Sequence, residues 1–185
     1  MIKLHLGCGW RNFGPEWVHI DGGDYEHLDH KDISNLIYDD NSVDLIYASH
    51  VIEYFDREEV ISVLKEWHRV LKPGGTLRLA VPDFFAMTKL YFVDEYPLEE
   101  ILGPLYGKMD MGDEKIYHKT TYDESDLRRL LSTLGFKNFR RYDWREYPVH
   151  VKNDDHSQAY KPNMDKDNGT LISLNIEVTK WKNSN

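Results

Sequence analysis

The feature that most constrains this chain is a glycine turn that ends an apolar run within the first ten residues. The run ends at Leu6, the turn at 7–9 reads Gly-Cys-Gly, and a second apolar run, 17–20, ends in Asp21. Glycine lets the backbone take a positive φ and approach a ligand with no Cβ in the way. An acid at the tip of the next strand can accept hydrogen bonds from both hydroxyls of a ribose. Together these features predict a nucleoside site at one edge of a sheet.

A Gly-x-Gly turn alone is equally consistent with a strand-ending turn that binds nothing. A dinucleotide site is disfavoured, because its third glycine would stand at position 12, where the chain has Asn12. That site also needs a crossover helix facing the pyrophosphate, and the short connection between the two runs leaves little room for one. The chain also lacks a Walker-type phosphate loop.

Composition predicts one soluble domain over 1–185. Hydrophobic residues make up 41% of the 185 residues, enough for a core, and the net charge of −9 argues against a non-specific grip on nucleic acid. No apolar run approaches the roughly 20 residues that a membrane span needs. Cys8 is the only cysteine, which excludes an internal disulfide and favours a reducing compartment. The chain enters a strand at once, which predicts no signal peptide. We therefore expect a cytoplasmic location.

The first half of the chain reads as strands around one amphipathic helix. A helix over 57–71 begins with a capping box formed by Asp56 and Glu59 and ends at Lys-Pro-Gly-Gly, 72–75. Strand, helix and strand in that order imply a parallel pair with a right-handed crossover. Strands are predicted at 1–6, 17–20, 43–48 and 76–81, with a short one at 31–33.

The second half is less regular. A helix is predicted over 84–93, breaks follow at 97, 103, 104 and 107, and Asp123 caps another helix that ends at Gly135. Segment 143–169 reads as a polar, aromatic loop. Strands at 136–142 and 171–178 have no helix between them, so we expect them to pair as an antiparallel edge.

In their order and spacing these pieces resemble class I S-adenosylmethionine-dependent methyltransferases, from Met1 to about Val178. The resemblance rests on the glycine turn, Asp21, Asp32-Ile33, the strand 43–48 with Ser49-His50, the Arg-Val-Leu-Lys-Pro-Gly-Gly segment 69–75 and the final strand pair. It implies an α/β, Rossmann-like sheet, mostly parallel with an antiparallel C-terminal edge hairpin, in a minimal version that lacks the N-terminal helix. It also implies acceptor-side insertions at 82–122 and 143–169.

The resemblance implies a set of contacts to S-adenosyl-L-methionine and to the product S-adenosyl-L-homocysteine. The turn beside the methionine moiety is expected to be Leu6, Gly7, Cys8 and Gly9, with Cys8 only a small residue. The ribose acid is Asp21, the adenine shelf is Asp32 with Ile33, and Ser49 lies where its strand opens to the cofactor. A solvated turn remains the alternative for Asp21, and a plain capping role remains the alternative for Asp32.

The chain departs from the family pattern in two further respects. The first two crossovers are clipped, and the third glycine of the commoner pattern is Arg11. We therefore expect a cofactor cleft that is more open than usual unless the two insertions close it.

Transfer of a methyl group to a hydroxyl needs a base, and histidine has a pKa near neutrality. His50 follows the strand 43–48, and His118 ends the irregular insert where similar sequences have a His-Lys pair. Both are candidate bases, with capping or packing as the alternative. Asp83 is a candidate contact for an acceptor hydroxyl. Segment 154–156, Asp-Asp-His, reads as a solvated loop, although its histidine could reach over the cleft. No metal is predicted.

Aromatic residues of the two insertions could line an acceptor pocket, although we expect at least half of them to fill the core: Phe84, Phe85, Tyr91, Phe92, Tyr106, Tyr117, Trp144, Tyr147 and Tyr160. Aromatic surface mixed with aspartate and histidine suits a small polar acceptor such as a sugar. The sequence thus predicts methyl transfer to a small molecule or glycan, at oxygen. The alternatives are cofactor binding without catalysis, methylation of protein or nucleic acid, and aminopropyl transfer. The oligomeric state is not predicted.

Overall fold

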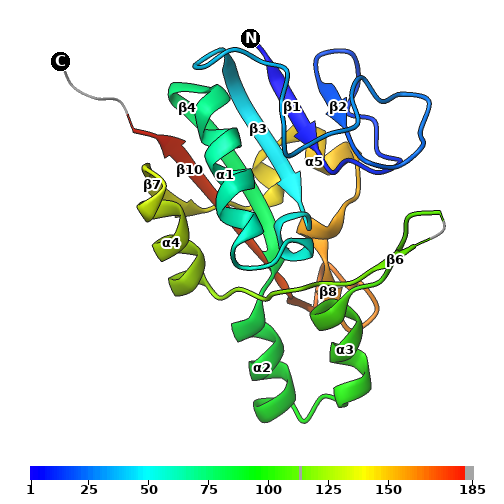
Figure 1. Cartoon of the computed structure of the whole chain (residues 1–185). Coiled ribbons are helices and arrows are strands. Elements are labelled where there is room, and N and C mark those ends of the chain that lie inside the picture. Colours follow the sequence, from blue (N-terminus) through cyan, green and yellow to red (C-terminus); the bar gives the residue numbers. More distant parts are fainter. Residues whose placement is uncertain (113, 182–185) are drawn as a thin grey trace.

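A computed structural model describes residues 1–112 and 114–181, which fold around one six-stranded sheet (Figure 1). The strand order is β2-β1-β3-β4-β10-β7. The strands are β1 (Lys3–Leu6), β2 (Val18–Ile20), β3 (Val43–Ser49), β4 (Leu71–Pro82), β7 (Phe136–Arg141) and β10 (Ser173–Lys180). The first four pair in parallel, whereas β10 runs antiparallel to both β4 and β7. The predicted parallel sheet with an antiparallel final pair is confirmed.

The predicted strand at 31–33 does not form. Only an isolated bridge joins Ile20 to His30. The side chain of Asp32 instead accepts hydrogen bonds from the amides of Ser34 (2.8 Å) and Asn35 (3.2 Å). A side chain that bonds nearby amides offers the backbone a turn in place of a sheet ladder, and here the turn prevails.

Helix α1 (Glu59–Val70) forms as its capping box predicts. Glu59 donates its amide to Oδ1 of Asp56 (2.8 Å), and Asp56 donates its amide to Oε2 of Glu59 (3.0 Å). The expected stop at 72–75 is a bulge inside β4, because the pairing partner of β3 jumps from Leu71 to Thr76. The helix therefore passes into the strand with no separate loop.

Two layers cover the sheet (Figure 1). On one face α1 and α4 (Glu124–Thr133) bury Trp67 and Leu127 against Ile46. On the other face Tyr47 joins an aromatic cluster that includes Trp144 and the N-terminal loop. Successive side chains of a strand point to opposite faces, so β3 supplies both cores from neighbouring positions. No helix in the described ranges is long and apolar enough to cross a membrane.

The segment 82–122 contains more helix than expected. The predicted α2 (Phe84–Val93) is present, but α3 (Leu98–Tyr106) runs through Gly103 and Pro104, where a break was predicted. Both residues lie in the last turn, and the helix ends at Gly107 with φ +54°. A small hairpin follows, formed by β5 (Met109–Asp110) and β6 (Lys115–Ile116).

The predicted loop 143–169 is also partly regular. It contains the 3-10 helices η2 (Trp144–Glu146) and η3 (His156–Gln158), the helix α5 (Pro148–Lys152) and β8 (Tyr160–Lys161), which pairs with β9 (Thr170–Leu171). Two of its aromatic residues are buried, namely Trp144 (8% exposed) and Tyr160 (7%). This segment thus forms the second face of the core.

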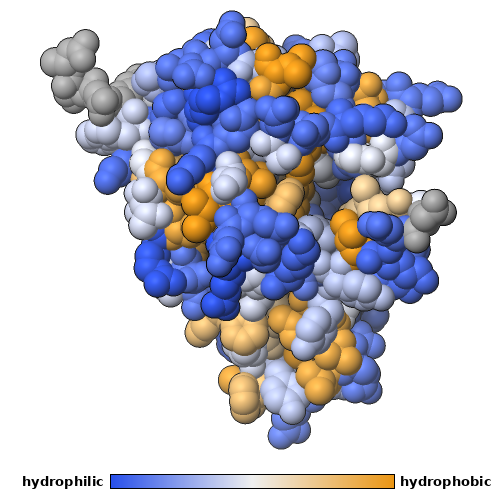
Figure 2. Space-filling model, in the orientation of Figure 1, coloured by the Kyte–Doolittle hydropathy of each residue, from blue (hydrophilic) through white to orange (hydrophobic). Residues whose placement is uncertain are grey.

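Most aromatic residues of the first insertion lie at the surface. Figure 2 shows hydrophobic side chains gathered over α2 and α3. The expectation that at least half of the nine aromatic residues fill the core was wrong, because six are at least 40% exposed: Phe84, Phe85, Tyr91, Phe92, Tyr106 and Tyr117. All but Tyr117 lie on α2 and α3, which bury other side chains, Met87, Leu90 and Ile101, in a small core cluster.

Candidate functional site

The structure brings the glycine turn and Asp21 together at the carboxyl ends of β1 and β2. Gly7 and Gly9 have φ values of +64° and +56°. Oδ2 of Asp21 accepts the amide hydrogen of Gly9 (2.8 Å), and Oδ1 accepts that of Gly23 (2.7 Å). Each carboxylate oxygen keeps a lone pair for a further donor. The acid is thus held by two turns and is not the freely solvated residue that the alternative assumed.

Gly7 is required at its position by a close neighbour. A Cβ on this residue would lie 2.3 Å from Cγ2 of Val51. Val51 follows β3, and both residues line a pocket that opens in front of the turn. The absence of a side chain therefore lets two chain segments meet behind the pocket.

A pocket of about 370 Å³ opens in front of this turn. It contains five of the predicted site residues, Gly7, Asp21, Asp32, Ile33 and His50. Its remaining wall comes from Tyr54, Phe55, Glu59, the β5–β6 hairpin and Lys119, among others. A larger hollow of about 600 Å³ lies beside α4, away from the glycine turn.

Four predicted cofactor residues do not line this pocket: Leu6, Cys8, Gly9 and Ser49. The Leu6 and Cys8 side chains are buried. Burial, with a smaller effect of Asp21, raises the pKa of Cys8 to about 12, which agrees with a small packing residue. The Ser49 hydroxyl faces Oδ1 of Asp155 at 3.5 Å.

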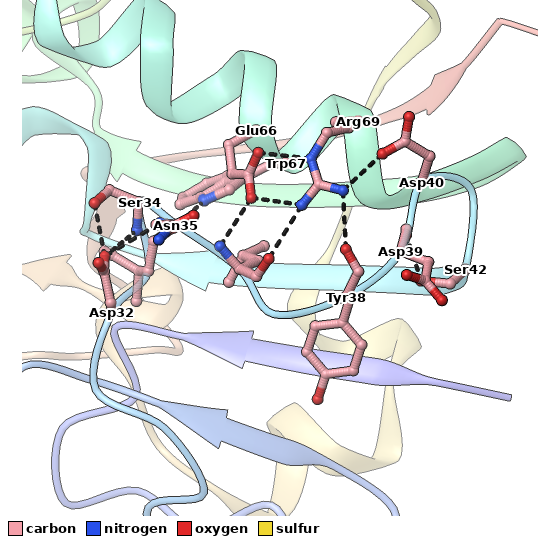
Figure 3. Close-up of polar contacts among 12 residues, drawn as sticks. Asp32, Ser34, Asn35, Tyr38, Asp39, Asp40, Ser42, Glu66, Trp67 and Arg69 are labelled. Atoms are coloured by element: carbon pink, nitrogen blue, oxygen red, sulfur yellow. Dashed lines mark hydrogen bonds and ion pairs between the residues drawn. The ribbon is translucent and has the colours of Figure 1, made fainter.

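The segment that carries Asp32 and Ile33 is fastened to α1 (Figure 3). Trp67 donates Nε1–H to the carbonyl of Ile33 (2.7 Å), and Arg69 reaches the carbonyl of Tyr38 (2.9 Å). Hydrogen bonds from Ser34 hold the pKa of Asp32 below its ordinary value. The capping role that was the alternative for Asp32 is present, and the residue also lines the pocket.

A second pocket, of about 430 Å³, adjoins the first and shares His50 and Tyr54 with it. The structure brings three histidines together here, His50, His118 and His156. They come from the end of β3, the segment after β6 and η3. The rest of the lining is mainly apolar or glycine, from α3 and the segment after it, Ala159 and Ile172.

His50 is held on both sides of its ring. It has φ +55°, a rare conformation for a residue other than glycine that is often found at functional sites. Its Nε2 lies 3.1 Å from Oγ of Ser173, and its Nδ1 lies 3.5 Å from Oε1 of Glu53. Burial, then His156 and His118, lower its pKa well below the ordinary value. The imidazole is therefore neutral at neutral pH.

His118 has one nitrogen anchored and one facing inward. Its Nδ1 donates to the carbonyl of Leu105 (3.2 Å), because a carbonyl can only accept. Its Nε2 lies 3.8 Å from Oε1 of Glu53. A Cβ on Gly107 would lie 2.3 Å from this nitrogen, so the ring packs directly on that glycine. Burial lowers the pKa of His118.

Glu53 is the residue that sequence reasoning missed. It lies in the short helix η1 (Ile52–Tyr54) and is 0% exposed, and neither carboxyl oxygen has a hydrogen-bond partner among the residues that the structure describes. Burial raises its pKa to about 8. The available signal was an acid inside the apolar run Val-Ile-Glu-Tyr-Phe, 51–55, directly after a strand.

Two further expectations were wrong. Asp83 lines neither of the two pockets: it is 3% exposed and accepts the amide hydrogen of Ala86 (3.2 Å) at the start of α2. The segment 154–156 is not simply solvated, because Asp155 is buried and accepts a hydrogen bond from the Tyr47 hydroxyl (2.6 Å). Among residues 1–112 and 114–181 no three acidic, histidine or cysteine side chains are grouped as metal ligands.

The strand order, with β10 antiparallel to its neighbours and next to the edge strand β7, agrees with the Rossmann-like fold that the resemblance implies. The first pocket lies at the carboxyl ends of β1 and β2. A family model described as a methyltransferase domain matches residues 15–79. A methyltransferase structure from Methanosarcina mazei aligns over 97% of this chain and 92% of its own, with a TM-score of 0.58 and 21% identity. A Burkholderia thailandensis 1,6-didemethyltoxoflavin-N1-methyltransferase, solved with bound 1,6-didemethyltoxoflavin and S-adenosylhomocysteine, aligns over 98% of this chain and 71% of its own, with a TM-score of 0.56 and 12% identity. These likenesses confirm the Rossmann-like fold.

The amino-acid sequence is also similar to those of enzymes with an assigned name. A demethylmenaquinone methyltransferase of Staphylococcus haemolyticus is 30% identical over 126 residues, 62% of this chain and 49% of the relative. That of Staphylococcus epidermidis is 32% identical over 123 residues, 60% and 47%. The chain thus spans about half the length of the curated relatives it matches.

Proposed function

We propose that this protein transfers a methyl group from S-adenosyl-L-methionine to a small molecule. The observation that carries the proposal is the junction of two pockets at His50 and Tyr54, with the glycine turn and Asp21 on one side. Methyl transfer needs donor and acceptor held in line at near-attack distance. Two adjoining pockets with a shared wall can hold the methyl donor in one pocket and the acceptor in the other, in that alignment.

The residues of the first pocket fit the cofactor. The free lone pairs of Asp21 can accept from the ribose hydroxyls, and the bare backbone at Gly7 allows close approach. Ile33 offers an apolar surface to the adenine ring, on a segment fixed to α1. The cofactor supplies the electrophilic methyl group, and these side chains bind and orient it.

We assign the acceptor to the second pocket. Its wall combines apolar groups such as Pro104 and Ile172 with a few imidazoles, which favours a small aromatic or apolar molecule with one polar group over a glycan. The naming of the Staphylococcus relatives for a small molecule supports this class. We further propose oxygen as the accepting atom, because a hydroxyl needs a proton acceptor and Nε2 of His118 provides one.

Calorimetry with S-adenosylhomocysteine tests the cofactor site. Asp21→Ala should weaken binding about tenfold or more, since hydrogen bonds to a charged group contribute about 1.5–3 kcal/mol. The matched control is Asp39→Ala, an exposed acid outside both pockets, which should bind like the parent. Equal affinity of the two variants would refute the ribose assignment.

Methyl labelling tests the acceptor class. Labelled S-adenosylmethionine and a native extract should yield label in a small-molecule fraction. Label in large macromolecules would contradict a small acceptor, and binding without any label would indicate a cofactor-binding protein without catalysis.

A further inference from the structure

A buried carboxyl group lies behind the junction of the two pockets. Oε1 of Glu53 is 3.5 Å from Nδ1 of His50 and 3.8 Å from Nε2 of His118. The Glu53 side chain is fully buried, and within residues 1–112 and 114–181 both its oxygens lack a hydrogen-bond partner. A buried, unpartnered polar group is costly to the fold and calls for an explanation.

The hydrogen-bond chain behind His50 determines which of its nitrogens carries the proton. Asn175 donates Nδ2–H to the carbonyl of Ser157 (2.8 Å), so its Oδ1 is free to accept from the Ser173 hydroxyl (2.9 Å). The only hydrogen of that hydroxyl is then used. Ser173 must therefore accept from Nε2 of His50. The neutral ring consequently presents the lone pair of Nδ1 to Glu53.

His118 presents a lone pair to the same carboxyl group. Its Nδ1 carries the proton that it donates to Leu105, which leaves Nε2 unprotonated in the neutral ring. A carboxylate between two lone pairs finds no donor, whereas a protonated carboxyl offers one hydrogen to either nitrogen. The geometry therefore favours one proton on Glu53, and the pKa of about 8 that burial produces agrees.

The other groups near Glu53 do not place a cation against its carboxyl. Lys119 donates only its backbone amide to the carbonyl of Glu53 (2.8 Å), and its ammonium pairs with Glu59 (2.8 Å). The neighbouring hydroxyls stay protonated: burial and Glu53 raise the pKa of Tyr54 to about 12 and also raise that of Tyr122. His156 stands behind His50, with ring centroids 5.1 Å apart. The carboxyl group of Glu53 is therefore available to balance a positive charge at the pocket junction by losing its proton.

We propose that Glu53 balances the charge of the sulfonium: it is protonated in the free protein, loses its proton when the cation binds, and regains one during methyl transfer. This role rests on the proposed function. Its physical basis is that a cation near a buried carboxyl favours the ionised form. Glu53 touches neither ligand and is a positioning and charge-balancing residue.

His118 and Glu53 account for the proton that methyl transfer to a hydroxyl releases. The acceptor oxygen forms a bond to the methyl carbon as the carbon–sulfur bond breaks, and sulfur keeps the electron pair. The hydroxyl proton is taken up by the pair formed by His118 and ionised Glu53, whose facing atoms Nε2 and Oε1 lie 3.8 Å apart, and it ends on Glu53. Sulfur ends neutral, and Glu53 is protonated as before.

Calorimetry in two buffers of different ionisation enthalpy measures the predicted proton release. At pH 7 the wild-type protein should release close to one proton per S-adenosylmethionine and none with the uncharged thioether S-adenosylhomocysteine. The release should vanish as pH passes about 8, where Glu53 is already ionised. Glu53→Gln should bind both ligands and release no proton. The matched control Glu58→Gln, an exposed acid just before α1, should release as many as wild type.

The results of these titrations test the charge-balancing role of Glu53 separately from the assignment of the cofactor pocket. If wild type binds neither ligand, the proposed function fails. If wild type and Glu53→Gln bind and release equal numbers of protons, the role of Glu53 is refuted and the pocket assignment stands. Should Glu53→Gln fail to fold, wild type alone decides: S-adenosylmethionine affinity should rise about tenfold per pH unit between pH 6 and 7, with that of S-adenosylhomocysteine unchanged. Parallel curves for the two ligands would overturn the proposal.

Discussion

At the scale of single residues, the site depends on places where a side chain is missing. Gly7 lets the first turn meet Val51, and Gly107 lets His118 pack against the end of α3. Both glycines also have positive φ. Both the backbone conformation and the lack of space for a Cβ therefore favour glycine at these two positions. Substitutions can separate the effect of conformation from the effect of space.

Gly7→Ala should lower both stability and cofactor affinity. The positive φ costs about 1–2 kcal/mol, and the clash of Cβ with Val51 at 2.3 Å adds to it. Gly9→Ala is the matched control, because its φ is also positive but no atom of the described ranges lies within 4 Å of the added Cβ. Urea unfolding and calorimetry with S-adenosylhomocysteine measure both effects. Equal losses in the two variants would show that the contact with Val51 does not matter.

At the scale of elements, α1 has two tasks. Its apolar stripe covers the sheet, and its polar edge holds the 32–42 segment that carries the proposed adenine shelf (Figure 3). Arg69 hydrogen-bonds to the carbonyls of Leu36 and Tyr38 and pairs with Glu66 and Asp40. One helix thus fixes part of the pocket wall.

Arg69→Ala should loosen that segment. Two carbonyls lose their donor, and an unsatisfied, partly buried group costs about 1–3 kcal/mol. Hydrogen exchange at residues 33–38 should accelerate, and stability should fall by a similar amount. Arg129→Ala, at a more exposed ion pair on α4, should change stability by less than about 1 kcal/mol. Unchanged exchange in Arg69→Ala would contradict the anchoring role.

At the scale of the whole molecule, Glu53 links folding to pH. Its pKa rises from an ordinary 4.5 to about 8 on burial, so the folded state binds more protons than the unfolded state between those values. Stability from this group is present at low pH and is lost as pH rises toward 8. Buried His5 and His50, whose pKa values are lowered, act in the opposite direction: their contribution is lost as pH falls through their ordinary value.

The difference in unfolding free energy between wild type and Glu53→Gln isolates the pH dependence due to Glu53, because the other titratable groups are common to both proteins. Unfolding free energies from urea titrations at pH 5 to 9 should show wild type losing stability relative to the variant by a few kcal/mol, since one pKa unit is about 1.4 kcal/mol. A constant difference across this range would mean that the pKa of Glu53 is not raised.

Local signals accounted for much of the fold. The capping box of Asp56 and Glu59, the apolar stripe of α1 and the glycine turn beside Asp21 act over a few residues, and each forms as predicted. Predictions were wrong where a local competitor or tertiary packing decided. Asp32 formed a turn in place of a strand, and α3 continued through Pro104 in its last turn.

The sequence by itself determined the strand–turn–strand unit, the capped helix and the parallel sheet, because periodicity, capping and turn chemistry are encoded in neighbouring residues. Only the tertiary structure decided where the histidines lie and which groups they contact. His50 and Glu53 are neighbours in one turn, at i and i+3, and distant parts of the chain bring His118 and Ser173 to them behind one pocket wall. Burial and the direction of each lone pair set their protonation, and both depend on how those segments pack.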